Sequence, residues 1–257
     1  MRTGWPGSPS PTTDFRLGRI LAVLLLACAL AAPAGIPGSV PTARAAGPAV
    51  MTLTLVRHAE SMGNASGVID SSTPGPPLSP LGWVQAQVVA AELAGGGHDG
   101  LYASTMIRTQ QTAEPLANLT GEPVVVLPGL REIEAGVFEG QPEASAGDYS
   151  GGYFTAPARW LRGDRSARIP GSIDGNEFDA RFDEAVQQIH ADGAVNPVAF
   201  AHAASIMVWV MMNVDNPDPD LLLQRPLRNT GRVVLTGSPG QGWTLVDWDG
   251  IPVRHRP

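Results

Sequence analysis

The chain has 257 residues, of which 43% are hydrophobic and 16% are charged, a composition that excludes a largely disordered protein. The formal charge is −7, with 24 acidic residues against 17 basic residues, and every basic residue is arginine. This acidic balance argues against general nucleic-acid binding, and the lack of lysine excludes a lysine-containing phosphate-binding loop.

The first 45 residues resemble an export signal followed by a linker. Arg16 and Arg19 precede an apolar run over 20–34, and Ala43-Arg44-Ala45 fits the small-x-small pattern of a cleavage site. The apolar run is shorter than the roughly 20 residues that a membrane-spanning helix needs. We therefore predict a signal peptide and linker over 1–45 and a secreted or cell-envelope protein. An uncleaved membrane anchor and a lipid anchor at Cys28 are the alternatives.

Residues 46–257 are interpreted as one folded domain. This part of the chain carries 13 arginines and 23 acidic residues, a formal charge of −10. Cys28 is the only cysteine of the chain, so the domain contains neither a disulfide nor a thiol nucleophile. We expect no stable membrane span after removal of the signal, and no nucleic-acid partner.

The first element expected in this domain is a buried strand over 51–56, which is short, apolar and partly β-branched. The strand leads directly into Arg57 and His58. A helix is then expected to begin at Pro80, with Ser79 as its N-cap. The apolar residues that indicate its buried face are Leu81, Val84, Val88, Ala91 and Leu93.

Strands and helices then alternate along the chain. After a strand over 100–103, a helix capped by Ser104 or Thr105 is expected to bury Ile107, Thr112, Leu116 and Leu119. Further on, we expect a strand over 122–127, an irregular cap insertion over 140–176, a helix over 176–191, a strand over 197–201, a helix over 204–213 and strands over 232–236 and 243–247. This alternation predicts a three-layer α/β/α fold with a largely parallel central sheet.

Histidine directly follows two of the predicted strands. One strand runs into Arg57 and His58, and the strand over 197–201 runs into His202. Because ligands of open parallel sheets bind at the carboxyl ends of the strands, both imidazoles are expected at the same edge. Neutral imidazole is a nucleophile, and Arg57 and Arg108 can donate paired hydrogen bonds to phosphate oxygens. The sequence therefore predicts a site for phosphoryl chemistry.

Five short motifs, taken in their order and spacing, resemble those of the histidine phosphatase superfamily, which includes cofactor-dependent phosphoglycerate mutase. The resemblance covers about residues 51–250. The motifs are Leu55–Ser61 followed by Asn64; Leu78–Gly82 followed by Gln85 and Ala86; Tyr102–Ser104 followed by Arg108, Gln111, Thr112 and Ala113; Leu130–Glu132 followed by Gly136 and Phe138–Gly140; and Val198–His202.

The resemblance implies a role for each matching residue. His58 would form a phosphohistidine. Arg57, Arg108 and His202 would hold the phosphate with help from Asn64, and His202 would also belong to the catalytic set. Glu132 would protonate the leaving oxygen and later activate water. The implied reaction is hydrolysis of a phosphomonoester without a metal or other cofactor, on a small-molecule or other phosphorylated substrate.

Burial of Glu132 near Glu134 and Glu139 is expected to raise its pKa, as a general acid requires. Glu134 and Glu139 themselves are interpreted as solvated or structural residues.

Two alanines depart from the family pattern. Ala59 and Ala203 stand where the family usually has glycine after each histidine, and we expect each methyl group to tighten the phosphate pocket. A weakly active or inactive phospho-ligand binding module is therefore one alternative function. A phosphomutase is the other, but the loop that mutases carry after the nucleophile is reduced here, which favours hydrolysis.

Four arginines recur every three residues in the cap insertion: Arg159, Arg162, Arg165 and Arg168. If this segment is helical, they would line one face and attract an anionic substrate. The alternative is a solvated face paired with Asp164 and other acids.

Overall fold

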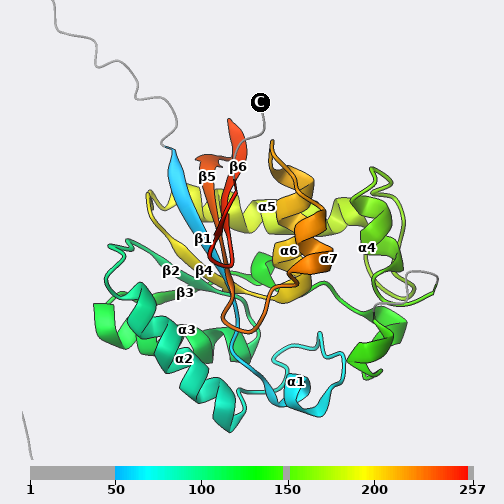
Figure 1. Ribbon diagram of the computed structural model, residues 1–257, viewed down its shortest axis with the longest axis horizontal. Helices are drawn as coiled ribbons and strands as arrows, with labels where there is room; N and C mark the ends of the chain where they lie inside the picture. The colour runs from blue at the N-terminus through cyan, green and yellow to red at the C-terminus, as the bar shows by residue number, and fades with distance from the viewer. Residues whose placement is uncertain (1–49, 147–150, 254–257) are drawn as a thin grey trace, which may run out of the picture. The chain divides into compact units, whose positions relative to one another are not determined.

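The structure is a computed structural model that describes residues 50–146 and 151–253 (Figure 1). The predicted signal segment, its cleavage site and Cys28 lie outside the described residues and stay predictions. None of the helices in the described ranges is both long and apolar enough to cross a membrane.

A seven-stranded mixed sheet forms the centre of the domain, with the strand order β3-β2-β4-β1-β5-β6-β7. Strands β3, β2, β4 and β1 are parallel to one another, whereas β5, β6 and β7 are added antiparallel. The predicted α/β class is confirmed, and the parallel part of the sheet holds the strands of both histidines. The strands are β1 (Met51–Arg57), β2 (Leu101–Ala103), β3 (Val124–Val126), β4 (Val198–Ala201), β5 (Arg232–Ser238), β6 (Gly242–Trp248) and β7 (Ile251–Pro252).

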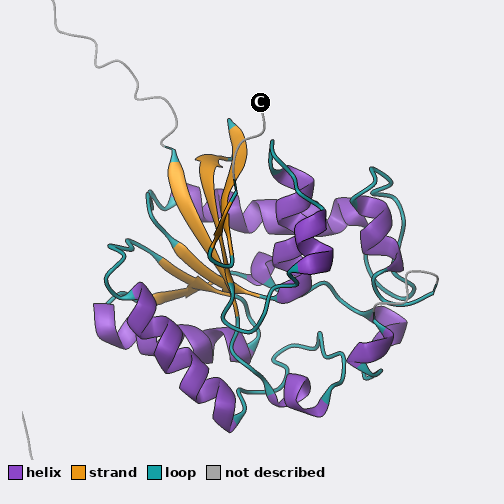
Figure 2. Cartoon of the chain, viewed as in Figure 1, coloured by secondary structure: helices purple, strands orange, loops and turns teal. Residues whose placement is uncertain are grey.

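Helices cover both faces of the sheet, which completes the predicted three layers (Figures 1 and 2). Helices α2 and α3 lie on one face, and α5 and α6 lie on the other. The helices are α1 (Met62–Ser66), α2 (Pro80–Leu93), α3 (Ile107–Thr120), α4 (Thr155–Trp160), α5 (Gly175–Ala191), α6 (Ala203–Asn213) and α7 (Asp220–Gln224), with short 3₁₀ turns at Pro128–Leu130, Gly136–Phe138 and Glu143–Ser145.

Helix α2 begins as predicted but buries a different face. Ser79 caps the helix by accepting a hydrogen bond from the backbone N–H of Gly82. Most of the predicted apolar face is wrong, because Leu81, Val84 and Val88 are 53%, 60% and 54% exposed and Ala91 is exposed as well. Leu93 is buried as predicted, together with Gly82, Ala86, Val89 and Ala90. Gly82 approaches so closely that a Cβ there would lie 2.0 Å from the carbonyl oxygen of Glu60, which fixes the small-residue face inward.

Helix α3 begins after Met106 without a side-chain cap, so the predicted caps Ser104 and Thr105 are wrong. The Ser104 hydroxyl instead accepts the N–H of Met106, before the helix starts. Thr112 and Leu116 are buried as predicted, but Leu119 is exposed. The Ser104 side chain is thereby left beside the end of the sheet, where the second histidine lies.

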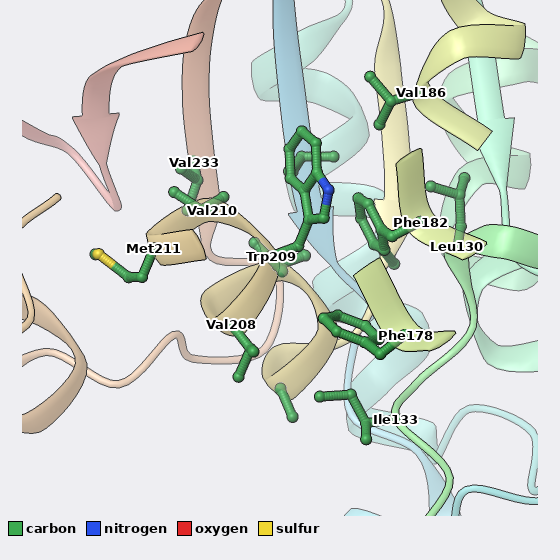
Figure 3. Close-up of a cluster of buried hydrophobic side chains, with 14 of the residues drawn as sticks. Leu130, Ile133, Phe178, Phe182, Val186, Val208, Trp209, Val210, Met211 and Val233 are labelled. Carbon is green, nitrogen blue, oxygen red and sulfur yellow. The ribbon is translucent and has the colours of Figure 1, made fainter. Parts of the chain in front are cut away.

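The larger core cluster lies between the sheet and α5 and α6, and its centre is aromatic (Figure 3). Phe182 of α5 stacks on Trp209 of α6 with ring centroids 4.9 Å apart. Phe178, one turn before Phe182, stacks on Trp160 of the cap at 5.7 Å. A separate cluster around Phe200 fills the space under α2 and α3. The strand that ends at the second histidine is therefore packed on both faces.

In the part of the predicted cap insertion that the structure describes, the elements are short, chiefly α4 and the turn at Glu143–Ser145. Its arginines do not form a cationic face, because three of them pair with acids. Arg159 pairs with Asp164, Arg165 with Asp179, and Arg168 with Asp174 and Glu177. The acid-paired interpretation is confirmed for these three residues, and none of the four arginines lines the main cavity.

Candidate active site

His58 lies immediately after β1, on a backbone fixed by the neighbouring strand. Its N–H donates to the carbonyl of Ala201, at the end of β4, over 3.0 Å. The side chain is only 4% exposed. Its Nδ1 lies 2.6 Å from the carbonyl oxygen of Ala59, so this nitrogen carries the proton of the neutral ring. The lone pair is then on Nε2, which faces the guanidinium of Arg108.

His202 follows β4 and lies beside His58, with ring centroids 5.1 Å apart. Its Nε2 is 2.9 Å from the Ser104 hydroxyl, and its buried Nδ1 has no hydrogen-bond partner among the described residues. Burial and then the charge of Arg108 hold the pKa values of both histidines well below their usual range. Both rings are therefore neutral at pH 7.

Arg57, which is half-buried, and Arg108, which is buried, bring two positive charges to this edge of the sheet. Arg57 donates to the Leu227 carbonyl over 2.8 Å, while Arg108 donates to His58 Nε2 over 3.1 Å and to the Asp70 carbonyl over 3.0 Å. Neither forms an ion pair with a carboxylate within the described residues. The Arg57 Nε and Arg108 Nη1 groups are buried without partners there. Buried, uncompensated guanidinium groups are suited to an anion that arrives with the ligand.

The side chain of Glu132 reaches the first residues of α6. Its carboxylate accepts from the backbone N–H groups of Ser205 at 2.7 Å, Ile133 at 2.9 Å and Ala204 at 3.2 Å. Burial raises the pKa of this carboxyl, against the opposing effect of these hydrogen bonds and of Arg108. The expected direction of the shift therefore agrees with the structure.

Glu134 and Glu139 are not among the causes that shift the pKa of Glu132, and both acids have other partners. Glu134 lies 2.8 Å from Arg131 and 3.6 Å from Arg181. Glu139 accepts hydrogen bonds from the N–H and hydroxyl of Ser71, at 2.8 and 2.6 Å. Their interpretation as structural residues agrees with these contacts.

Asn64 lies in α1, where it forms a reciprocal capping box with Ser61. Its Oδ1 accepts from Asn229 over 3.3 Å, and its Nδ2 donates to the Glu143 carboxylate over 2.9 Å. Asn64 lines the same cavity as His58, as its predicted role requires, but one of its donors is already directed to Glu143.

Sequence reasoning missed the residues that hold the nucleophile segment in place. Asn229 donates to the His58 carbonyl over 3.1 Å, and Thr230, in the left-handed region with φ of 58°, donates its N–H to the Arg57 carbonyl. Thr112 accepts from the Ala59 N–H over 3.0 Å and donates to the Arg108 carbonyl over 2.6 Å. Thr112 belongs to the same sequence motif as Arg108, so its place near the site could have been predicted from the sequence. Nothing in the local sequence marks Asn229, which is far from His58 along the chain.

These residues surround a cavity of about 320 Å³. His58, Arg57, Arg108, Glu132 and Asn64 all line it, whereas His202 lies behind them, fully buried. Two further acids, Asp70 and Glu143, contribute to the wall, as does Tyr153. The apolar lining consists of Val68, Ile69, Ala146, Phe154, Ala203, Ala204, Met207, Pro226 and Leu227.

Only one of the two unusual alanines contacts this cavity. Ala203 lines it, but Ala59 packs in a small cluster with Leu78 and Ala86. The expectation that the Ala59 methyl group tightens the pocket is therefore wrong, because this methyl group packs against α2 and not against the cavity. No group of three or more acids, histidines or cysteines suited to a metal ion occurs in the described ranges.

Comparison with known proteins places these residues in a family context. A family model described as the histidine phosphatase superfamily (branch 1) matches residues 53–250. A PE-PGRS family protein of Mycobacterium tuberculosis, PE_PGRS11, is 47% identical over 218 residues, which are 79% of this chain but only 37% of that protein. A Yersinia pestis protein named "Probable phosphoglycerate mutase GpmB" is 28% identical, covering 61% of this chain and 72% of its own.

The fold is also shared with solved structures. The mycobacterial glucosyl-3-phosphoglycerate phosphatase aligns over 78% of this chain and 99% of its own, with a TM-score of 0.63 and 23% identity. At this identity the likeness concerns the fold.

Proposed function

Because the chain belongs to the histidine phosphatase superfamily, we propose that it hydrolyses phosphomonoesters through a phosphohistidine on His58, without a metal ion. One observation supports this most directly. The Nδ1 proton of His58 is held by the Ala59 carbonyl, so the lone pair is on Nε2, where it accepts a hydrogen bond from the guanidinium of Arg108 that an arriving phosphate group can take over. A neutral nucleophile is thus placed next to a fixed positive charge that can bind the phosphate it attacks.

In the first step, His58 Nε2 attacks phosphorus and the bond to the ester oxygen breaks. Arg57 and Arg108 hold the phosphate oxygens. When the Ser104 hydroxyl donates to Nε2 of His202, the proton of that ring is on Nδ1, from which His202 donates to a phosphate oxygen. Glu132, whose pKa is raised by burial, acts in its protonated form and gives its proton to the leaving oxygen. The products are the free alcohol and phosphohistidine.

In the second step, the Glu132 carboxylate accepts a proton from water, and the water oxygen attacks phosphorus. The P–N bond breaks, its electron pair returns to Nε2, and inorganic phosphate leaves. The neutral ring, the two arginines and the protonated carboxyl are restored, so no oxidant, reductant or metal is required.

The test uses the full chain and phenyl phosphate, with and without a chelator. We expect release of inorganic phosphate in both conditions, and an acid-labile, base-stable phosphoryl adduct that His58→Ala abolishes. Loss of activity on chelation, or an adduct that survives in His58→Ala, would refute the proposal. A phosphomutase would return the phosphoryl group to an organic acceptor and release little phosphate, and a binding module would form no adduct.

A further inference from the structure

The charges around the cavity are balanced for one phosphate group only. Among the described residues that line it, Arg57 and Arg108 are the only cations. A phosphate dianion would neutralise both of them. The remaining charged side chains, Asp70, Glu132 and Glu143, are all acidic. A second anionic group on the substrate would therefore find no counter-charge.

Glu143 is fixed in this wall by two contacts. Its carboxylate accepts from Asn64 Nδ2 over 2.9 Å, and its N–H donates to the Gly67 carbonyl over 2.8 Å. Asn64 is in turn held by Asn229 and by the capping box of α1. Burial lowers the pKa of Arg57, and the charges of Glu132 and then Glu143 oppose this, which places Glu143 within electrostatic reach of the phosphate end.

Asp70 is less available to a ligand. Its Oδ1 accepts from the N–H and hydroxyl of Ser72, at 3.0 and 2.6 Å. Its carbonyl accepts from Arg108, so this residue mainly holds the arginine and its own loop. Glu143 is therefore the better candidate of the two for an acid that faces the part of the substrate beyond the phosphate.

The apolar lining indicates what that part of the substrate contacts. It includes the aromatic ring of Phe154, the flexible side chain of Met207 and the aliphatic residues Val68 and Ile69. A cavity of about 320 Å³ is at the small end of the range for small-molecule sites. It suits a compact alcohol with an apolar face.

We propose that the site selects phosphomonoesters whose alcohol part is compact, partly apolar and free of negative charge, and that Glu143 excludes substrates with a second anionic group. This inference rests on the proposed hydrolysis. Phosphorylated carboxylic acids and bisphosphates are disfavoured, because Glu143 repels the additional charge. A hydroxyl or ammonium group on the alcohol is accepted, because the carboxylate can receive a hydrogen bond from it.

The experiment compares phenyl phosphate with 4-carboxyphenyl phosphate on the full chain. We expect kcat/KM for the carboxylated ester to be lower by roughly tenfold, the size expected for two like charges a few ångströms apart near a protein surface. In Glu143→Gln this ratio should fall to about threefold or less. The ratio between variants cancels the intrinsic difference in reactivity between the two leaving groups.

Glu122→Gln is the matched control, because Glu122 is exposed and precedes β3 at the opposite end of the strands. It should leave the substrate ratio at the wild-type value. An unchanged ratio in Glu143→Gln, or an equal change in Glu122→Gln, overturns the assignment of Glu143.

Binding of phenylphosphonate and 4-carboxyphenylphosphonate, measured by calorimetry, separates this inference from the proposed reaction. Tighter binding of the uncharged compound without turnover of either ester would support the selection and refute the hydrolysis. Turnover of both esters with equal kcat/KM would support the hydrolysis and refute the selection against a second negative charge. Failure to bind either phosphonate, together with no turnover, would refute both.

Discussion

Glu132 is the residue whose protonation state decides whether the proposed first step can occur. It is buried, which raises its pKa, yet three backbone N–H groups at the start of α6 favour its charged form. Arg181 contributes to its placement by donating to the Glu132 carbonyl over 3.2 Å. The carboxyl can therefore alternate between acid and base without moving, as the two proposed steps require.

The first prediction concerns the pH dependence of this residue. The rate of the first step should fall as pH rises through the raised pKa of Glu132, because the proton donor is lost. The low histidine pKa values should keep the nucleophile neutral below pH 6.5. Glu132→Gln should lower kcat/KM by roughly 10²–10⁴-fold and remove the alkaline decline in phenyl phosphate hydrolysis. A variant with unchanged rate and pH profile would exclude Glu132 as the acid.

The buried histidines give a second prediction, for stability. Their folded-state pKa values are lowered, so the unfolded chain binds more protons as pH falls below about 6.5, and stability decreases in that direction. Each histidine contributes at most about 1.4 kcal/mol per pH unit. Urea unfolding at pH 7 and 5 should therefore show a smaller pH dependence in His202→Gln than in the wild type. The raised pKa of Glu132 has the opposite effect on stability, at pH values above 4.5, and this effect is present in both proteins. Equal pH dependence in the two proteins would contradict this account.

Thr112 supports both sides of the site through one hydroxyl group. It accepts the Ala59 N–H next to His58 and donates to the backbone of Arg108. Thr112→Val should lower the free energy of unfolding by about 1–3 kcal/mol, because a buried N–H and a buried carbonyl lose their partner. It should also reduce kcat, whereas Thr112→Ser should retain most of both quantities. Chemical denaturation and steady-state kinetics measure both quantities. Equal losses in Thr112→Val and Thr112→Ser would contradict this role of the hydroxyl group.

At the scale of the elements, helix α2 shows what periodicity can and cannot predict. Ser79 and Pro80 mark its start from local chemistry alone, and the structure confirms them. The buried face depends instead on which residues allow the helix to approach the nucleophile loop. Gly82 permits that contact, so the larger apolar residues Leu81, Val84 and Val88 are turned outward. The hydrophobicity pattern of the helix cannot predict how closely α2 approaches the loop that follows His58.

Gly82→Ala tests the close contact between α2 and the His58 loop. In an ordinary helix this change is stabilising by up to about 1 kcal/mol. Here the new Cβ would lie 2.0 Å from the Glu60 carbonyl, so we expect destabilisation by roughly 1–3 kcal/mol and a loss of activity as the loop shifts. Gly95→Ala is the control, because a Cβ there meets no atom within 4 Å. Equal melting temperatures for the two variants would contradict the packing argument.

At the scale of the whole molecule, the candidate site combines segments that the sequence could place only in part. The two strand ends identified His58 and His202, and the direct pairing of β1 with β4 brings them together. The motifs located Arg108 and Glu132. The cavity walls come from α1, the turn at Glu143, the cap and the segment around Leu227. Their positions depend on tertiary contacts between distant residues, so the contact between Asn64 and Glu143 could not be predicted.

An aromatic row through Trp160, Phe178, Phe182 and Trp209 connects the cap to α6, whose first turn binds the Glu132 carboxylate. Figure 3 shows Phe178, Phe182 and Trp209 of this row. Phe182 is fully buried in the middle of this row and does not line the cavity. Phe182→Ala should therefore lower the free energy of unfolding by about 3–5 kcal/mol and the melting temperature by roughly 6–20 °C.

That loss lies below the total stability typical of such domains, so the Phe182→Ala protein should remain folded at 25 °C. Its kcat on phenyl phosphate should stay within about threefold of the wild type, because a global loss of stability is distinct from a change at the site. Leu119→Ala, at a side chain that is 61% exposed, is the control and should change stability by about 0.5 kcal/mol or less. Thermal unfolding followed by circular dichroism measures both. A Phe182→Ala protein with the same melting temperature as Leu119→Ala would show that the aromatic row does not stabilise the fold. A protein that stays folded but loses kcat would show instead that the row positions α6 and, through it, Glu132.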